Sequence, residues 1–475
     1  MQLAKSITLK KIKTLRIFLL TFVVLFFSVF SPAFSQDNSP YSRFGIGDLV
    51  PATHIIGRSM GGISAGYNNF LSINFNNPAS YSSFQAIKEL KSKKLISGRA
   101  VLDLGLNFEG RTLKEPKSLA PKFIANNALF SYVQVGVPLN SNWGLSFGLR
   151  PVSRISYNII SNERLVDPLT GLPIDSATTR FEGDGGSYLA SVGTGVKLFH
   201  RDTKNGEEKL SIGINGGYLF GQKNYSTKRS LINDTVVYNQ AFYETKTTYG
   251  NIYFNAGAQY KVPLKKNISL TLGAYGNWSQ KLNASRDVSR ETFLFDPNQG
   301  IVRLDSVSDL RNEKGKIISP SSFTVGFVTE KIPFGKEGGW LFGIDFTQQN
   351  WDQYRSYGQK DSVKNKWELH VGTQLRPASK RNYFSNVAYR AGFFLGPDYI
   401  KVNEKLSQIG ISFGLGLPVS NYRSSYASAN QATLINIAFE YGKRGNNNNL
   451  LRENTFRFSL GFSLSDLWFG KKKFD

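Results

Sequence analysis

The chain has 475 residues, a formal net charge of +24 and no cysteine, and it is rich in glycine (45), phenylalanine (36) and tyrosine (22). Without cysteine, we expect neither disulfide bonds nor a lipid-modified cysteine anchor. The abundant glycine and aromatic residues, with only 2 methionines, favour a fold of many antiparallel strands.

The first 35 residues have the pattern of a cleaved secretory signal peptide. Five positive charges precede the apolar run "IFLLTFVVLFFSVF", and small residues precede an expected cut between Ser35 and Gln36. That run has about 14 residues, whereas a spanning helix needs roughly 20, which disfavours the alternative of a membrane anchor. Removing these five charges lowers the formal net charge from +24 to +19. An exported basic chain is expected to meet anionic lipids or solutes rather than nucleic acid.

Residues 36–95 follow no regular structural period. In "GRSMGGISAGYNNFLSINFNNPASYSSF" (57–84), glycine and asparagine disfavour a helix, and Pro78 would interrupt a central strand. Apolar residues such as Met60, Ile63 and Phe75 make the segment too apolar for a solvated linker. Such a backbone can lie at membrane depth only when protein surrounds it. We therefore expect a plug, with Asn76, Asn77, Pro78 and Ala79 as its candidate residues against an inner wall.

Alternation of apolar with small or polar residues recurs from about residue 96 to the end. In "WGLSFGLR" (143–150), for example, one face carries Trp, Leu, Phe and Leu, and the other carries Gly, Ser, Gly and Arg. Many of these segments exceed the usual five or six residues of a strand and reach the roughly 9–11 that cross a membrane. An even number of such segments suits a closed antiparallel barrel, which leaves no unpaired edge in lipid. Fourteen segments are predicted: 96–108, 126–138, 142–156, 184–199, 208–223, 245–262, 267–280, 320–331, 338–350, 365–376, 386–398, 406–417, 431–443 and 454–466.

The connections alternate between short and long, as in outer-membrane barrels. Turns 139–141, 263–266 and 332–337 are predicted on the periplasmic side, and long loops 157–183, 224–244 and 281–319 outside; connection 418–430 is long for the periplasmic side. Tryptophan favours the lipid–water boundary. We expect one girdle of Trp143, Trp340 and Trp468 and another of Trp278, Trp351 and Trp367. The chain closes with an alternating strand, "NTFRFSLGFSLSDLWF".

Four sequence motifs resemble the FadL/OmpP1/TodX family of outer-membrane transporters for hydrophobic compounds. Segment 57–84 resembles the N-terminal hatch of that family, with its Asn-Pro-Ala step before the barrel. The motifs "YSRFGIGD", "FEGDGGSYLASVGTGVKL" and "LSDLWFGKKK" resemble its Bacteroidota branch. The Asn-Pro-Phe turn that some members carry is replaced here by Asn77-Pro78-Ala79.

The resemblance implies a fourteen-stranded monomeric barrel in the bacterial outer membrane, plugged by its N-terminus. Its parts would be a signal peptide (1–35), a hatch (36–95) and a barrel (96–475). It also implies capture of an apolar ligand from outside and sideways exit into the bilayer. In the family the lateral gap lies at the third strand, where this chain has Pro151. Proline cannot donate a ladder hydrogen bond, so Pro151 is a candidate lateral gate; alternatively, the strand ends at Arg150 and a loop begins.

Strand parity places a set of charged residues on the inner face of the barrel. Charges on the lipid face would cost a few kcal/mol, so an inward position is expected. They either line a solute path or form salt bridges that fix the plug. The candidates are Arg99, Asp103, Arg150, Asp345, Glu368, Arg376, Arg390, Glu440 and Arg457, together with Lys197 and His370.

An enzyme is not expected, and neither are cofactors or metals. The three histidines, His54, His200 and His370, are scattered and show no metal-ligand spacing. A surface lipase would need a Ser–His pair, and the inward parity of His370 argues against one. There is no phosphate-binding glycine loop between a strand and a helix.

Two classes of function remain for an outer-membrane barrel in contact with lipid and lipopolysaccharide. The first is uptake of hydrophobic or amphipathic, fatty-acid-like molecules. The second is a structural or docking subunit of an outer-membrane protein assembly or secretion complex, with protein partners. A continuous apolar cavity would favour transport, whereas an inner face packed with salt bridges would favour docking.

Overall fold

The computed structural model describes residues 39–88, 95–117, 119, 121–232, 238–296, 300–379, 382–402, 404–419 and 431–468. All of them belong to one compact unit, Asp37–Asp475. The expected signal peptide, residues 1–35, lies outside the described residues. Among the described residues, no helix has the length and apolarity needed to cross a membrane.

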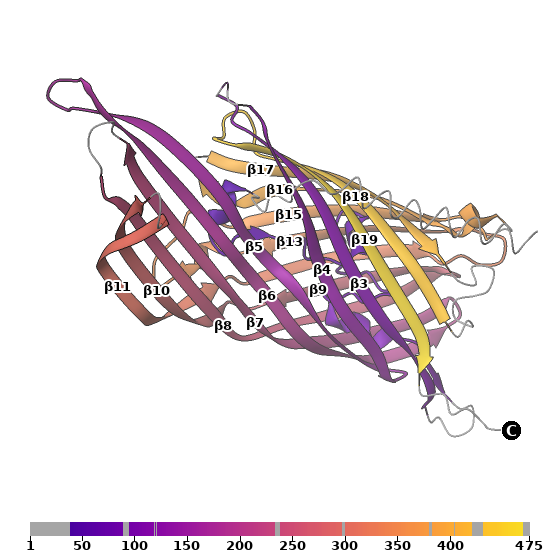
Figure 1. Cartoon of the computed structure of the whole chain (residues 1–475). Helices are drawn as coiled ribbons and strands as arrows, with labels where there is room; N and C mark the ends of the chain where they lie inside the picture. The colour runs from indigo at the N-terminus through magenta and orange to yellow at the C-terminus, as the bar shows by residue number, and fades with distance from the viewer. Residues whose placement is uncertain are drawn as a thin grey trace, which may run out of the picture. The chain divides into compact units, whose positions relative to one another are not determined.

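The described part of the chain forms one closed antiparallel sheet with fourteen strand positions (Figure 1), as predicted. Two positions are split, because β9 (Ile268–Asn277) continues as β10 (Gln280–Asp296), and β11 (Gly300–Ser319) continues as β12 (Ser322–Lys331). The other positions are β3 (Leu95–Lys114), β4 (Phe123–Asn140), β5 (Trp143–Val166), β6 (Pro173–Thr203), β7 (Gly206–Ile232), β8 (Gln240–Lys265), β13 (Gly339–Gln349), β15 (Lys366–Arg376), β16 (Ala388–Val402), β17 (Glu404–Pro418), β18 (Gln431–Arg444) and β19 (Arg452–Trp468).

The barrel closes through the pairing of its last strand with its first. Strands β19 and β3 pair from Arg452↔Lys114 to Trp468↔Gly98. Strand pairing fixes which residues share a face, so alternate residues of each strand point into the lumen. On β7, for example, Ser211 and Asn215 are buried inside, whereas Ile212 and Ile214 are exposed outside.

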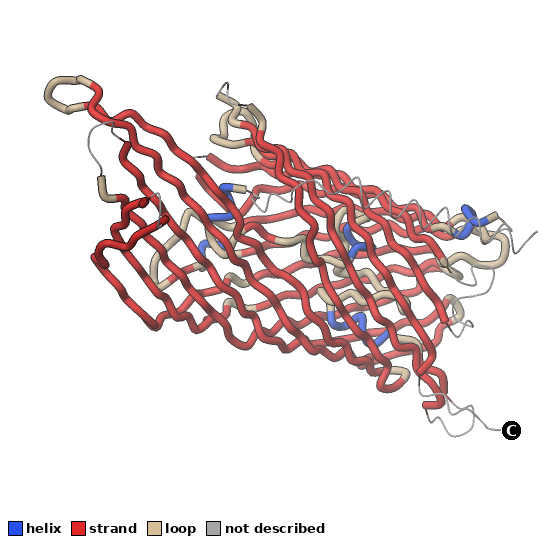
Figure 2. The backbone as a smooth tube through the Cα atoms, viewed as in Figure 1, coloured by secondary structure: helices blue, strands red, loops and turns tan. Residues whose placement is uncertain are grey.

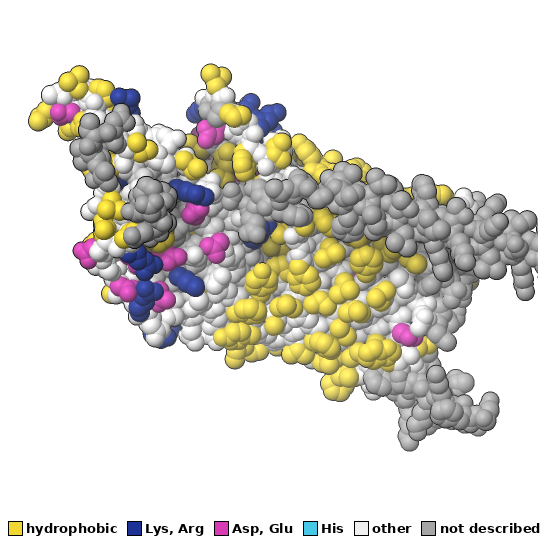
Figure 3. Space-filling view, in the orientation of Figure 1, with side chains coloured by type: hydrophobic (Ala, Val, Ile, Leu, Met, Phe, Trp, Pro, Cys, Tyr) yellow, Lys and Arg dark blue, Asp and Glu magenta, His cyan; other side chains and the backbone are white. Residues whose placement is uncertain are grey.

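The wall carries an apolar outer band. In Figure 3 hydrophobic side chains gather over the middle of the visible wall, whereas charged side chains gather at the end that carries β10 and β11. Trp143, Trp340, Trp468, Trp278 and Trp367 are exposed on the outer surface, as the two predicted girdles require. The prediction for Trp351 was wrong. The chain turns inward after β13 into η3 (Trp351–Gln353), and Trp351 is buried with its ring centroid 4.1 Å from that of Tyr399.

The two ends of the barrel differ. At the end that we name the short-turn end, β4 and β5 are joined by residues 141–142, β6 and β7 by 204–205, and β8 and β9 by 266–267. At the opposite end, which we name the extended end, the β5–β6 hairpin projects beyond the other strands (Figure 1).

The long irregular loops predicted at the extended end are largely absent, and that prediction was wrong. Strand β5 runs on to Val166 and β6 starts at Pro173, and β10 and β11 fill most of 281–319. Cross-strand polar pairs stabilise these extensions. Arg229 forms an ion pair of 2.5 Å with Glu163, and Arg286 forms one of 2.7 Å with Glu313.

The N-terminal segment, which we define as residues 39–84, lies inside the barrel. Figure 2 shows loops and short helices enclosed by the strands. Its elements are η1 (Pro40–Arg43), β1 (Asp48–Leu49), α2 (Ile55–Arg58) and η2 (Pro78–Ser83). Most of its residues are buried, and many of them pack against inward side chains of the wall. Short β2 (Ala86–Lys88) then pairs with β3, β14 (Arg355–Ser356) pairs with β11, and η4 (Tyr383–Asn386) precedes β16.

Candidate functional site

The turn at Asn76–Ala79 is seated directly on the backbone of the wall. A Cβ atom added at Gly213 would lie 2.4 Å from the carbonyl carbon of Pro78, and one at Gly257 would lie 2.2 Å from Oδ1 of Asn77. Glycine is therefore required at both wall positions for this close approach. The Asn77 side chain donates to the carbonyls of Ala65 (2.8 Å) and Ala258 (3.2 Å) and accepts from the backbone N–H of Ala79.

Two inward aspartates bind the backbone of the N-terminal segment. Asp345 on β13 accepts hydrogen bonds from the backbone N–H groups of Ser64 (2.6 Å) and Ala65 (2.7 Å). Asp103 on β3 accepts one from the backbone N–H of Ile73 (3.2 Å). These carboxylates were predicted from strand parity to face the lumen, and the structure shows that each of them holds part of the N-terminal segment in place.

A buried network of ion pairs connects the N-terminal segment to four wall strands. Asp48 of β1 forms ion pairs with Arg111 on β3 (2.7 Å) and Arg444 on β18 (2.9 Å). Both arginines also contact Glu453 on β19, at 3.1 and 3.3 Å. Burial raises the pKa of Asp48, but the attraction of Arg111 and Arg444 outweighs it and holds that pKa below its ordinary value.

The network continues along the inner wall. Glu109 bridges Arg111 (2.7 Å) and Arg457 (2.6 Å), and Arg457 also pairs with Glu440 (3.4 Å). Arg444 pairs with Asp398 (2.5 Å) on β16. Buried charges are tolerated when they are paired in this way, and Asp48 is the residue through which the N-terminal segment joins the network.

The remaining predicted lumen charges lie at separate places on the inner face. Arg99 is buried and donates to Gln85 (2.8 Å), and Arg390 is buried and donates to Gln374 and Asn436. Arg150 lies 5.3 Å from the ring centroid of Phe75.

Glu368 pairs with Lys366 (3.1 Å), and His370 contacts the carbonyl of Gly61 at 2.7 Å. Lys197 pairs with Glu207 (3.3 Å). Arg376 is half-buried at the end of β15 and forms no ion pair with any residue that the structure describes.

A seam in the wall lies between β4 and β5. Their pairing runs from Asn140↔Trp143 to Val133↔Leu149 and stops there, while β5 goes on pairing with β6. Beyond this point the free edge of β5 is covered by the N-terminal segment. Asp48 and Leu49 pair with Arg154 and Ser153.

Pro151 lies two residues beyond the last β4–β5 pair. It is opposite Tyr188 of β6, and a bulge follows between Pro151 and Ser153. Strand β5 continues to Val166, so the alternative in which the strand ends at Arg150 was wrong. Pro151 therefore borders the seam.

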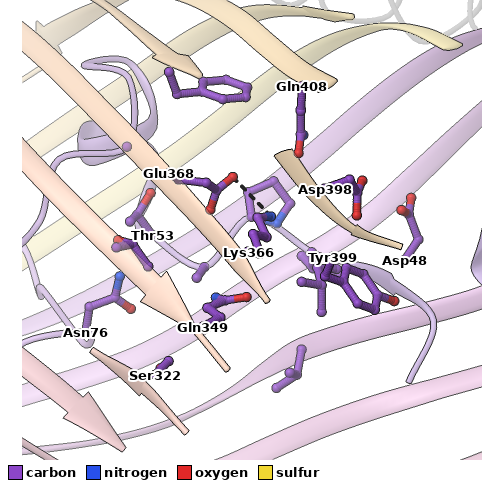
Figure 4. Close-up of a pocket in the computed structure, with 18 of the residues that line it drawn as sticks. Asp48, Thr53, Asn76, Ser322, Gln349, Lys366, Glu368, Asp398, Tyr399 and Gln408 are labelled. Atoms are coloured by element: carbon purple, nitrogen blue, oxygen red, sulfur yellow. Dashed lines mark ion pairs between the residues drawn. The ribbon is translucent and has the colours of Figure 1, made fainter. Parts of the chain in front are cut away.

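A cavity of about 330 Å³ lies in the lumen between the N-terminal segment and the wall. Figure 4 shows Asp48, Thr53 and Asn76 of the segment together with Lys366, Glu368 and Asp398 of the wall around this space, and Lys366 and Glu368 point toward one another. Apolar groups such as Leu49, Val152 and Leu219 also line it. The cavity thus has a mixed lining that includes many charged side chains.

Several members of the network were missed in the sequence because the predicted strands ended too early. Glu109 and Arg111 follow the predicted end at residue 108, Arg444 follows 443, and Glu453 precedes 454. Had the predicted strands been one to three residues longer, the alternation of faces would have placed all four side chains in the lumen. Nothing in the sequence pointed to Asp48 as their partner.

In the described residues, no cluster of three or more His, Asp or Glu side chains could hold a metal.

Comparison with known structures reveals the same architecture at low sequence identity. A Pseudomonas aeruginosa FadL homologue shares 14% identity with a TM-score of 0.52, and the match covers 90% of this chain and 100% of that chain. The P. putida toluene transporter TodX shares 14% identity with a TM-score of 0.48, and the match covers 87% of this chain and 98% of that chain. The CymD monoaromatic hydrocarbon channel shares 12% identity with a TM-score of 0.46, and the match covers 88% of this chain and 98% of that chain. At 14% identity the likeness to the FadL homologue shows the fold alone.

No curated protein matches the chain. The BamG family model, in contrast, matches residues 11–475, which is nearly the whole sequence. The chain therefore belongs to the BamG family.

Proposed function

We propose that this protein is a docking subunit of an outer-membrane protein assembly, with a lumen kept closed by residues 39–84 acting as a plug. The observation that carries this proposal is the extended end of the barrel. Strands β5, β6, β7 and β8 have 24, 31, 27 and 26 residues, whereas roughly 9–11 suffice to cross a membrane. The excess forms a paired sheet that would stand outside the membrane as a rigid platform.

The tip of this platform exposes apolar side chains to water. Val166, Leu169, Leu172 and Ile174 of the β5–β6 hairpin are 53%, 95%, 65% and 55% exposed, and Ile232 at the end of β7 is 55% exposed. Contiguous apolar groups on a solvated surface are characteristic of protein–protein contacts. The orientation that places this end outside follows from the long strands and short turns of outer-membrane barrels.

The lumen supports the same proposal. Its inner face is tied to the plug by buried ion pairs, and its cavity is lined by charged groups. An apolar ligand in this cavity would face charged groups that burial would strip of water, which is unfavourable.

The test is co-purification of tagged protein from native outer membranes after chemical crosslinking. A Leu169→Asp, Leu172→Asp double variant should lose its protein partners, whereas Ser161→Asp, a change at an exposed site of the same hairpin, should keep them. Partners that are absent, or equally retained by both variants, would refute the docking role.

Transport of hydrophobic or amphipathic small molecules is the second candidate, and the β4–β5 seam favours it. The wall lacks β4–β5 pairing beyond Leu149, and the lumen cavity includes Arg150 and Val152 at the seam. Sideways exit would spare an apolar ligand exposure to water, which costs about 25 cal/mol per Å² of apolar surface.

This second proposal predicts that Pro151→Val, which restores a backbone donor beside the seam, lowers uptake of a hydrophobic fluorescent probe without destabilising the barrel. Unchanged uptake, in a strain whose uptake depends on this protein, would exclude Pro151 as a gate.

A further inference from the structure

The outer face of the wall carries a hollow of about 1140 Å³ that the lumen site does not use. Its floor consists of small outward side chains on β8 and β9, where Ala256 lies opposite Gly276 and Ala258 opposite Ala274. Typical small-molecule pockets have roughly 300–1,000 Å³, so the hollow is large enough for a long chain-like ligand.

Larger side chains border this floor on both sides. Ile212 and Ile214 on β7 lie opposite the two alanines of β8, and Phe323 and Val325 on β12 lie opposite Gly276 and Ala274 of β9. Strands β7 and β12 are three strand spacings apart, or roughly 14 Å. The result is a groove with an alanine and glycine floor and walls of branched and aromatic side chains, all on the surface that faces lipid.

The groove ends in polar groups where the strands are interrupted. The chain leaves the ladder at Trp278–Ser279, between β9 and β10, and at Pro320–Ser321, between β11 and β12. The backbone N–H and the hydroxyl of Ser321 both donate to Oε1 of Gln353, at 3.1 and 3.0 Å. The amide nitrogen of Gln353 has no hydrogen-bond partner among the residues that the structure describes, so it remains a donor beside the hollow.

Two cations lie just beyond this polar end. Lys281 on β10 is opposite Ile318 on β11, which is opposite Arg355 on β14, so these three residues share the outer face. Their neighbours Leu282 and Ile317 point inward and are buried. The cations are two or three residues past the interruption, roughly 7–10 Å along the strands.

Neither cation is neutralised by the part of the chain that the structure describes. Within the described residues, neither Lys281 nor Arg355 forms an ion pair with a carboxylate. Nη1 of Arg355 donates only to the backbone carbonyls of Asp352 (2.7 Å) and Tyr354 (2.6 Å). Paired planar nitrogens on arginine and a lysine ammonium are well suited to phosphate oxygens.

We propose that this hollow is a binding site for a phosphate-bearing membrane lipid. Its acyl chains would occupy the groove between β7 and β12, and its phosphate would reach Lys281, Arg355 and the amide of Gln353. The depth of the site supports the assignment, because Trp278, exposed at the rim, marks the boundary between lipid and water. The apolar floor, the polar rim and the two cations thus follow one another along the wall, in the same order as the acyl chains, the polar linkage and the phosphate of such a lipid.

The test is native mass spectrometry of the full-length barrel released from nanodiscs that contain either phosphatidylglycerol or diacylglycerol with the same acyl chains. The wild-type protein should retain phosphatidylglycerol at least tenfold more than diacylglycerol. Ala274→Phe, which fills the groove, should lower retention of phosphatidylglycerol about tenfold, whereas Ala190→Phe, also outward but outside the hollow, should not. Folding of each variant is checked by its heat-dependent mobility on gels.

A second pair of variants tests the cations without altering the groove. The double variant Lys281→Gln, Arg355→Gln should lose the preference for phosphatidylglycerol, and Lys246→Gln, at another exposed outer position, should keep it. Equal retention by Ala274→Phe and Ala190→Phe, or no preference for the phosphate lipid in the wild-type protein, would overturn the proposal. Recovery of a second polypeptide in the groove in place of lipid would overturn it as well.

Discussion

Replacing Asp48 with asparagine tests the buried ion network most sharply, since it removes one charge and preserves size. Asp48 is the contribution of β1 to the network, and it contacts Arg111 at 2.7 Å and Arg444 at 2.9 Å. Removing one partner of a buried ion pair typically costs about 3–5 kcal/mol, because the other charge stays buried without compensation. Here Arg111 keeps Glu109 and Glu453, so the lower value, about 3 kcal/mol, applies.

That magnitude predicts a measurable opening of the plug. A loss of about 3 kcal/mol raises the population of the detached state roughly 150-fold, at 1.36 kcal/mol per factor of ten. The chain has no cysteine, so a single Thr53→Cys change places a unique thiol in a buried position five residues from Asp48. When closing is faster than labelling, the rate of thiol labelling follows the open population.

The control is Glu163→Gln, which breaks an ion pair with Arg229 whose side chains are 47% and 46% exposed. Exposed pairs contribute about 0–1 kcal/mol, so labelling at Thr53→Cys should change little in this variant. If Asp48→Asn accelerates labelling no more than Glu163→Gln does, the network does not hold the plug, and the reasoning from buried charge is refuted.

Two further predictions address the seating of the plug. Burial lowers the pKa of His54 to about 3, and the positive charges of Arg390 and Arg58 act in the same direction. The neutral form of His54 therefore stabilises the plug above pH ~6.5, and this stability is lost as the pH falls toward 3. The rate of hydrogen exchange of residues 51–60, corrected for intrinsic rates, should rise up to tenfold for each pH unit by which the pH falls below about 6.5. The variant His54→Phe should abolish that dependence. The same pH dependence in the variant would contradict the assignment to His54. Gly213→Ala should weaken plug seating by about 1–3 kcal/mol, because its Cβ would meet the carbonyl group of Pro78. The outward Gly216→Ala, whose Cβ has no neighbour nearer than 3.4 Å, should not, and equal labelling at Thr53→Cys in both variants would contradict the close approach.

The sequence predicted the barrel because its wall obeys a simple period. Inward and outward residues alternate along each strand except at bulges, so parity placed Asp103, Asp345 and Arg390 on the inner face, where they are found. Strand ends were harder to predict, because the hairpins at the extended end lose the regular alternation of apolar and polar residues and look like loops. That is why 157–183 was predicted as a loop and why Glu109, Arg444 and Glu453 were missed.

Other features depend on contacts between distant parts of the chain. Asp48 meets Arg111 and Arg444 only after the barrel closes, so no local pattern identifies the pairing. Trp351 follows a strand and looks like a girdle residue, yet η3 turns it toward Tyr399. The end of β4–β5 pairing at Leu149 is likewise set by the N-terminal segment, which occupies the edge of β5.

The conductance of single barrels in a planar bilayer tests the closed lumen most directly. Full-length protein should show no lasting open channel, because the plug and its ion pairs block the lumen. A variant that lacks residues 40–85, once shown by heat-dependent gel mobility to be a folded barrel, should conduct steadily. Equal conductance of the two proteins, whether both open or both closed, would contradict the account.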